Sequence, residues 1–335
     1  MSRGDPRVSF VVCTHNGGER LACVVANLAD RVRRAPVEIL VVDNASTDGS
    51  ASRLGRSPVG TAPPPRVVRE EKLGLTHARR AGVEAARGEV IVFVDDDNVL
   101  LDGWAEKLIE IFGSNPTVAA CGGYGIGCLP AGPIPWWFEQ HCSIFAIGGQ
   151  AEARGDVTQH PGHLWGAGLA VRREAVVQLF RDGFQSRAVD RMGSRLLSGG
   201  DSELCVALRV AGWRLWYDPA LVFLHLLTEP RFRPGYLKEL HFGFGRGSVL
   251  IDPYEWVLGD HARFPTRRHR SALWQLAIAL RVLVNPRRAA RRQTNVPIEF
   301  LAAMHRGRFM QLLRMGPAYD RSFSEIASAP WRRPR

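Results

Sequence analysis

The chain has 335 residues, of which 45% are hydrophobic, and its 44 basic and 33 acidic side chains give a formal net charge of +11. This composition suffices for one large domain or two smaller ones, and the basic excess fits nucleic acid, acidic lipid, a phosphorylated substrate or simply a basic soluble surface. No apolar run reaches the ~18 residues that span a bilayer, and the six cysteines contain no CxxC pair, which excludes a spanning helix and a zinc-type cysteine cluster.

Strand and helix patterns alternate along the first half of the chain. Short apolar runs predict strands over residues 8–12, 37–42, 66–70, 89–94 and 117–123. Amphipathic spacing predicts helices over residues 19–32, 75–88 and 104–116. Near-continuous apolar strands that alternate with helices indicate an α/β fold with a mostly parallel sheet covered on both faces.

Polar clusters follow three of these strands. THN (14–16) follows the first, DNASTD (43–48) the second and DDDN (95–98) the fourth. Ligands of such sheets bind beyond the carboxyl ends of the strands. We therefore expect the three clusters to crowd one edge of the sheet and to form a binding site there.

Three consecutive aspartates end the fourth strand. Like charges at this spacing repel one another unless a cation or strong donors lie among them. The spacing of Asp95 and Asp97 suits Mg²⁺ or Mn²⁺, which take oxygen ligands and often bridge a carboxylate to a diphosphate. The side chain of Asp96 should point to the opposite face. The alternative is an acidic loop that caps the next helix.

The second half is less regular until the tail. Residues 128–161 read as an aromatic loop, and residues 201–213 as a helix. Beyond Tyr254, the apolar stretch 271–284 has arginines on both sides. This pattern is typical of a basic amphipathic helix on an anionic membrane surface, although a helix packed on the domain with solvated arginines is the alternative. Reduced cysteines and an N-terminus without a signal-peptide core predict a cytoplasmic protein, peripheral at the inner face of the cell membrane if the tail binds lipid.

Several stretches together carry a family resemblance. They are VSFVVCTHN, EILVVDNASTDGS and KLGLTHARRAGVEAARGEVIVFVDDDN, followed later by GGDSELCVALRVAGWRLWYDP. In this order they resemble the family 2 glycosyltransferases of GT-A fold, up to about residue 225. The resemblance implies a Rossmann-like sheet flanked by helices, with a nucleotide-sugar half (1–125), an acceptor-binding and catalytic half (126–253) and a basic helical extension (254–335).

The implied activity is metal-dependent, inverting transfer of a sugar from a nucleotide sugar, most often a UDP-sugar, to an acceptor hydroxyl. By resemblance, the nucleotide sugar contacts Thr14, Asn16, Asp43, Gly74, Arg79, Asp95 and Asp96. Asp97 matches the direct ligand of Mg²⁺ or Mn²⁺, and His225 completes the metal shell or meets the diphosphate, unless it is structural. Gly17, His77 and Arg80 depart from the usual residues of the family, which leaves the nucleoside preference open.

Inverting transfer also needs a carboxylate that accepts the proton of the acceptor hydroxyl. Relatives place it in an acidic pair at the start of a helix, where this chain has Gly200 and Asp201. Asp201 is therefore the predicted base, because a helix N-terminus favours its ionised form. Glu203 is the alternative base, and a helix cap without catalysis is the other interpretation of Asp201.

The acceptor side is the least determined. Trp137 and Trp165, with Trp136, have planes that suit sugar rings, although core packing explains them equally well. Gly168 allows close backbone approach, and Glu203 is expected nearby. His241 and Arg246, with the glycines between them, are expected to form a flap over the diphosphate.

The acceptor itself is a lipid-linked sugar, a polysaccharide or a small molecule, as in glycoconjugate biosynthesis. A non-catalytic nucleotide-binding scaffold and a sugar-phosphate nucleotidyltransferase remain alternative functions. We expect no nucleic-acid partner, because no recognised motif accompanies the arginines of the tail.

Overall fold

The computed structural model describes residues 5–31, 36–54, 65–135, 137–188, 199–287 and 297–333 of the chain. They gather into two compact units. The first comprises residues 1–181 and 213–228, and the second comprises residues 182–212 and 229–335. The chain thus enters the second unit, returns to the first for one long strand and leaves again. This division differs from the three consecutive segments expected from the sequence.

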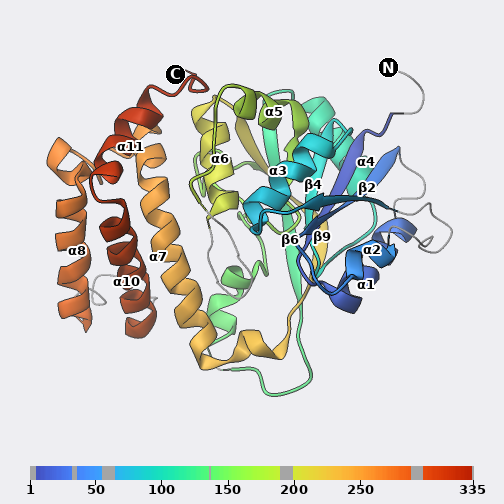
Figure 1. Cartoon of the computed structure of the whole chain (residues 1–335), viewed down its shortest axis with the longest axis horizontal. Coiled ribbons are helices and arrows are strands. Elements are labelled where there is room, and N and C mark those ends of the chain that lie inside the picture. The colour runs from blue at the N-terminus through green and yellow to red at the C-terminus, as the bar shows by residue number, and fades with distance from the viewer. Residues whose placement is uncertain are drawn as a thin grey trace. The chain divides into compact units, whose positions relative to one another are not determined.

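The first unit is built around one mixed sheet with helices (Figure 1). Its strands are β1 (Val8–Thr14), β2 (Val37–Asn44), β3 (Arg66–Glu70), β4 (Val90–Asp95), β5 (Asn98–Leu100), β6 (Val118–Cys128), β7 (Gly155–Asp156), β8 (Ala170–Arg172) and β9 (Arg214–Leu226). Its helices are α1 (Gly18–Arg31), α2 (Ser50–Leu54), α3 (Leu75–Ala85), α4 (Trp104–Ser114), α5 (Arg173–Arg181) and the 3₁₀ turn η1 (Glu139–Phe145). The strand order is β3-β2-β1-β4-β8-β6-β9-β5, and β7 pairs with β9.

The long strand pairs of the sheet are parallel. Strands β3, β2, β1 and β4 run parallel, as expected, and β6 runs parallel to β9. Strand β8 is antiparallel to both β4 and β6, and β5 is antiparallel to β9. The mostly parallel sheet expected from the sequence is therefore confirmed, with short antiparallel pairings at β8, β5 and β7.

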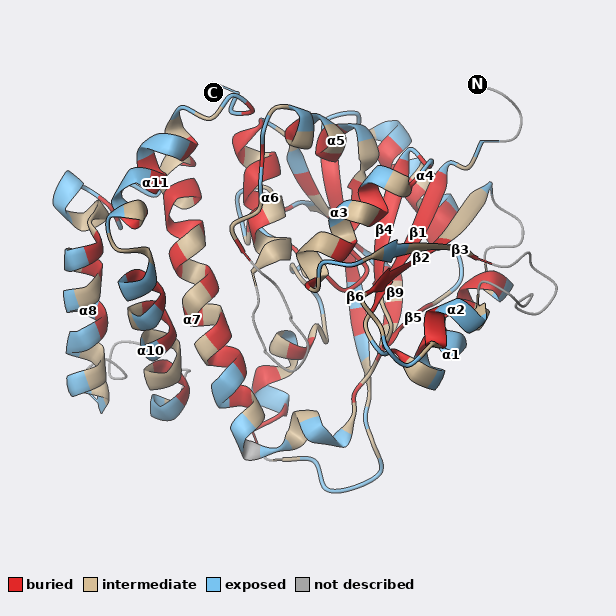
Figure 2. Cartoon of the chain, viewed as in Figure 1, coloured by how far each residue is buried: buried red, intermediate tan, exposed pale blue. Residues whose placement is uncertain are grey.

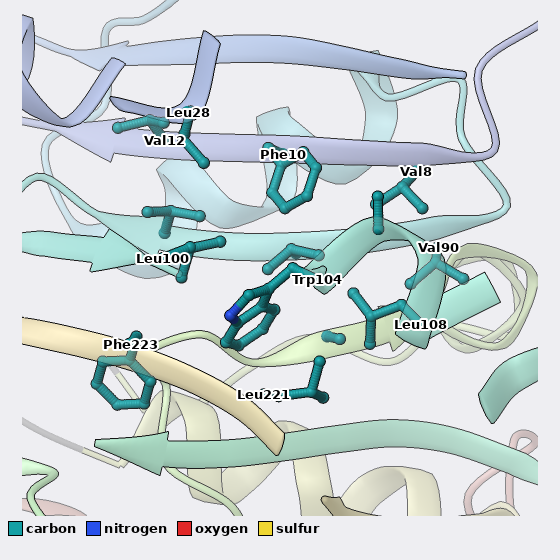
Figure 3. Close-up of a cluster of buried hydrophobic side chains, with 14 of the residues drawn as sticks. Val8, Phe10, Val12, Leu28, Val90, Leu100, Trp104, Leu108, Leu221 and Phe223 are labelled. Atoms are coloured by element: carbon teal, nitrogen blue, oxygen red, sulfur yellow. The ribbon is translucent and has the colours of Figure 1, made fainter. Parts of the chain in front are cut away.

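The apolar runs recognised in the sequence form the centre of this unit. Every residue of β1 is buried. Phe10 of β1, Trp104 of α4 and Phe223 of β9 meet in one core cluster with Leu108 and Leu221 (Figure 3). Such aromatic side chains remove a large apolar area from water, so they fix the sheet and its covering helices against one another.

The register of the parallel strands brings the polar clusters together. Thr14 at the end of β1 is paired with Asp43 of β2, and Cys13 is paired with Asp95 of β4. All three strands therefore end at one edge of the sheet. The expectation that the three polar clusters crowd one edge is confirmed.

The second unit is helical. It contains α6 (Gly200–Val210), α7 (Pro234–Val257), α8 (Ala272–Val284), α10 (Ile298–Met315), α11 (Pro317–Ala327) and the 3₁₀ turns η2 (Glu229–Phe232) and η3 (Arg267–Arg270). Helix α10 packs against both α7 and α8. A core cluster contains Val249, Phe264, Leu312, Tyr319 and Phe323. None of the described helices is both long enough and apolar enough to cross a membrane.

The crossing of α7 and α10 explains the glycines around Arg246. A Cβ on Gly245 would overlap the carbonyl of Met304, so only glycine permits this approach. His241 is buried and stacks on Phe300 at 4.7 Å between ring centroids, and Arg246 donates to Gln311. The expected flap over a diphosphate is therefore wrong, because these residues belong to a packed helix.

Candidate active site

The loops after β1 and β2 are joined through Asn16. Its backbone has φ of +54°, and its side-chain Oδ1 accepts from the backbone N–H groups of Thr47 at 2.8 Å and Asp48 at 3.3 Å. Its own N–H donates to Ser46 Oγ at 3.0 Å, while the N–H of Gly18 donates to Asp48 Oδ2 at 3.0 Å. Asn16 therefore shapes the edge of the sheet by holding two loops together.

Asp43 lies at the same edge and is only 8% exposed. The N–H of Ser46 donates to its Oδ1 at 3.1 Å, and Arg69 donates to its Oδ2 at 2.6 Å. Arg69 stands opposite Asp43 in the parallel pairing of β2 with β3. The sequence analysis missed Arg69, because no motif contains it. Only the strand register could have indicated it.

Asn44, the next residue, positions the segment that leads into α3. Its Oδ1 accepts from the N–H of Gly74 at 2.7 Å, and its Nδ2 donates to the carbonyl of Lys72 at 2.8 Å. Gly74 has φ of +139°, which favours glycine. Farther along the same helix, the guanidinium of Arg79 lies over the ring of Phe93. Asn44 is also a site residue that the sequence analysis did not single out.

The three aspartates divide between two directions. Asp96 turns toward β1 and α1, where it accepts from Thr14 Oγ1 at 2.8 Å and lies 3.6 Å from Arg20. Burial raises the pKa of Asp96, and the charges of Asp97 and Asp95 add to this rise, while Thr14 and Arg20 oppose it. Thr14 is itself buried, and its hydroxyl group donates the hydrogen bond to Asp96.

Gly17 explains part of this packing. A Cβ at Gly17 would lie 2.9 Å from Asp96 Oδ2 and would overlap Thr14 Oγ1. A longer side chain at this position would therefore displace the contact between Thr14 and Asp96. Asp95 closes β4 and is partly exposed at the same edge.

Asp97 faces His225 at the junction of β5 and β9. The two strands place Asn98 opposite His225, and the N–H of Leu226 donates to the carbonyl of Asp97 at 2.8 Å. Nδ1 of His225 lies 2.6 Å from the carbonyl of Phe145, which can only accept. The Nδ1 atom therefore carries the proton, and the lone pair is on Nε2, which lies 3.6 Å from Asp97 Oδ2.

This pair fits a divalent cation. A separation of 3.6 Å is smaller than twice the ligand distance of about 2.1 Å that is typical of Mg²⁺. The carbonyl behind His225 supplies the orienting partner that metal-binding histidines usually have. Within the described ranges no group of three His, Cys, Asp or Glu side chains is arranged to hold a metal ion. A cation held by Asp97 and His225 would thus take its other ligands from elsewhere, as Mg²⁺ does with phosphates and water.

A glutamine positions the loop that contains Trp165 and Gly168. Gln150 Nε2 donates to the carbonyl of Gly123 in β6 at 2.9 Å, and its Oε1 accepts from the N–H of Trp165 at 2.6 Å. Trp165 is partly exposed, and Gly168 has φ of +66° beside Trp104. Gln150 was not identified from the sequence, since a lone glutamine in a loop carries no signal.

Trp137 is 9% exposed, and its ring stacks on Phe145 with 6.4 Å between centroids. It packs behind the residue whose carbonyl orients His225. This burial favours core packing over the predicted contact with a sugar. Trp136 lies outside the described residues.

In the second unit, Asp201 is the second residue of α6. Its Oδ1 accepts from the N–H of Ser202 at 2.7 Å, and the side chain is partly exposed. The position therefore suits either a base or a cap.

Glu203, two residues further on, has no exposed surface. Its oxygens accept from Ser186 Oγ at 2.5 Å, Arg187 N at 2.9 Å, Ala188 N at 2.8 Å and Tyr254 Oη at 2.9 Å. A carboxylate enclosed in this way cannot take a proton from an acceptor. The expectation of Glu203 as a base or acceptor contact is corrected to a structural role.

Comparisons of the sequence with known proteins match glycosyltransferases. The model of glycosyl transferase family 2 matches residues 9–180, about half of the chain. The chain is 22% identical over 262 residues to the glucosyl-dolichyl phosphate glucuronosyltransferase of Haloferax volcanii, covering 73% of this chain and 77% of that one. It is 25% identical over 274 residues to glycosyltransferase AglE of the same organism, covering 81% and 80%.

Two solved structures are similar in fold. S. aureus TarS residues 1–349 in complex with UDP-GlcNAc aligns with a TM-score of 0.54 and 13% identity, covering 95% of this chain and 91% of that one. GalNAc-T7 with UDP, GalNAc and Mn²⁺ aligns with a TM-score of 0.50 and 17% identity. The alignment covers 78% of this chain but only 55% of GalNAc-T7.

Proposed function

The chain belongs to glycosyl transferase family 2 and has the GT-A fold, and from this premise we propose that it transfers a sugar from a UDP-sugar to an acceptor hydroxyl with inversion. The observation that carries the proposal is the pair of Asp97 and His225, 3.6 Å apart at the sheet edge that also holds Asp43. The two solved structures of similar fold contain UDP or UDP-GlcNAc, which supports a uridine nucleotide as donor.

The sheet edge divides into a nucleoside side and a phosphate side. Asp43, held by Arg69 and Ser46, and the segment from Gly74 to Arg79, held by Asn44, face the nucleoside in this proposal. Asp95 contacts the ribose in this proposal. Thr14, Asn16 and Asp96 support these residues rather than contact the nucleotide, because their polar atoms already bind one another or the neighbouring loop.

Asp97 Oδ2 and His225 Nε2 would hold Mg²⁺ or Mn²⁺. When bound, such a cation stabilises the negative charge that develops on the departing nucleoside diphosphate. The protein supplies the geometry for it. The carbonyl of Phe145 fixes the tautomer of His225, and the N–H of Leu226 fixes the backbone of Asp97.

Asp201 is the proposed base. It takes the proton of the acceptor hydroxyl while that oxygen attacks the anomeric carbon, and the bond from that carbon to the diphosphate oxygen breaks. Attack opposite the leaving group inverts the anomeric configuration.

A lipid-linked sugar is the proposed acceptor, met at the inner face of the cell membrane. One relative that covers 73% of this chain is named for a dolichyl phosphate acceptor. Trp165 and Gly168, held by Gln150, lie on the loop that would meet the transferred sugar or the acceptor.

The proposal is tested by calorimetric titration with UDP, GDP and dTDP, each with Mn²⁺ and with EDTA. We expect UDP to bind with Mn²⁺ and to weaken strongly with EDTA or in Asp97→Ala. Asp102→Ala is the matched control, because Asp102 lies a few residues further along the chain but is 81% exposed and pairs with Arg31 at 2.6 Å. If no nucleotide binds under any condition, the donor site is wrong.

A measurement of turnover distinguishes an enzyme from a non-catalytic scaffold. UDP release from UDP-sugars should require both Asp97 and a lipid-linked acceptor. Tight UDP binding without turnover for any donor and acceptor would instead support a non-catalytic nucleotide-binding protein.

A further inference from the structure

Helix α8 has the reverse of the polarity expected for a helix on a soluble protein. The side that packs inward carries Ala272, Gln275 and Ala279, all buried. The opposite side carries Leu273, Ala277, Leu280 and Val284, which recur at the spacing of one helical face and are all exposed. Leu273 is 81% exposed and Val284 is 76% exposed. Figure 2 shows pale-blue residues along the length of α8.

The inward side is polar for a specific reason. Gln275 donates to the carbonyl of His269 at 2.8 Å and accepts from Arg308 at 3.2 Å. Arg308 in turn binds the fully buried Asp252. This polar contact therefore helps to anchor α8 to its unit, beside Leu276, which packs against the core cluster there. A surface helix normally shows the opposite pattern.

Neighbouring α10 extends the apolar surface. It packs against α8, and it exposes Met310 and Leu313 at 51% and 54%. We call Leu273, Ala277, Leu280 and Val284 of α8, with Met310 and Leu313 of α10, the apolar face. Exposed apolar side chains gathered on neighbouring helices in this way are typical of sites of contact with protein or membrane.

Positive charge is concentrated in the same region of the chain. Residues 261–298 contain nine arginines and no aspartate or glutamate. The rest of the chain has 35 basic and 33 acidic residues, so almost all of the net charge of +11 comes from this one segment. Arg267 and Arg268 are exposed just before α8, and Arg281 and Arg287 are exposed in its last turn and just after it.

We infer that the apolar face and these four exposed arginines form a docking surface for an anionic lipid membrane. Leucine and valine side chains enter the acyl boundary while arginines meet the headgroup phosphates, with the helix lying in the plane of the interface. A second copy of this chain fits less well, because two such surfaces would bring like charges together. The docking would serve the lipid-linked acceptor of the proposed function, but it does not require that function.

The test is co-sedimentation of the full chain with vesicles of phosphatidylcholine alone and of phosphatidylcholine with phosphatidylglycerol. We expect binding to the anionic vesicles, weakened by salt, and little binding to the neutral ones. The double variant Leu273→Glu, Leu280→Glu should bind at least tenfold more weakly. Each substitution of Arg267 or Arg281 by Gln should cost about fivefold.

Leu129→Glu is the matched control, because Leu129 is a leucine 41% exposed in the first unit. It should bind vesicles like the unaltered chain. The proposal is overturned if the unaltered chain binds no vesicles or if the double variant binds as well as it does. It is also overturned if the chain is a dimer that the double variant converts to a monomer.

The vesicle assay contains neither donor nor acceptor, so it fails or succeeds independently of sugar transfer. UDP titration of the double variant completes the test. Unchanged UDP affinity with lost vesicle binding would support the docking surface. Loss of both UDP affinity and vesicle binding would indicate that the double variant is misfolded, and the arginine substitutions would then decide the test.

Discussion

Replacing Glu203 by alanine tests whether this carboxylate is structural. The substitution removes the acceptor of two hydroxyl groups and two backbone N–H groups, contributed by Ser186, Arg187, Ala188 and Tyr254. Each buried donor left without a partner costs about 1–3 kcal/mol. Even if half of them find new partners, Glu203→Ala should lower the free energy of unfolding by about 3–5 kcal/mol.

Urea denaturation followed by tryptophan fluorescence measures this loss. Glu325→Ala is the control, since Glu325 is 52% exposed and pairs with Arg187 at 2.7 Å. An exposed ion pair of this kind contributes about 0–1 kcal/mol, so the control should unfold almost like the unaltered chain. The contrast between the two variants distinguishes a buried carboxylate from a surface carboxylate that contacts the same residue, Arg187.

A different result would refute the reasoning. If Glu203→Ala unfolded at the same urea concentration as the control but transferred no sugar, Glu203 would be a catalytic base and the enclosure described above would open in solution. If it was destabilised but retained turnover where folded, the structural role would stand.

Three further predictions concern the site and the second unit. Asp201→Asn should fold and bind UDP normally while turnover falls by about 10²–10⁴, measured as UDP release; unchanged turnover would remove Asp201 as the base. Gln150→Ala should raise KM for donor or acceptor more than it lowers UDP affinity, because it frees the loop of Trp165; equal effects on both would argue against a positioning role. Burial and the charge of Arg308 lower the pKa of His305 to about 4, below the ordinary value of 6.5, so its contribution to stability is present above about pH 6.5 and is lost as pH falls toward 4. His305→Gln should flatten the fall in urea midpoint between pH 7.5 and 5, and an unchanged slope would refute this.

Local patterns in the sequence sufficed for much of the first unit. Apolar runs with turn residues identified β1, β2 and β4, and the parallel register then placed their polar ends at one edge. Those signals are local, since a strand or a turn depends on a few neighbouring residues. The short antiparallel pairings of β8 and β5 were not predicted, because they depend on partners far along the chain.

The residues of the site also divide into those that the sequence indicates and those that it does not. The aspartate cluster and Asp201 stand out in the sequence because charged residues directly follow an apolar run or begin a helix. Asn44, Arg69 and Gln150 do not stand out, because each acts through a hydrogen bond to a segment that the fold brings near.

By itself, the sequence determined the class of fold, the polar edge and the apolar character of α8. Tertiary structure alone decided that His225 orients toward Asp97, that Glu203 is enclosed, and that α8 turns Leu273 and Leu280 outward. The physical reason is that burial and hydrogen bonding depend on what covers a side chain. For Glu203 the covering groups come from Tyr254, and for α8 from Arg308, and neither contact leaves a trace in the spacing of residues along the chain.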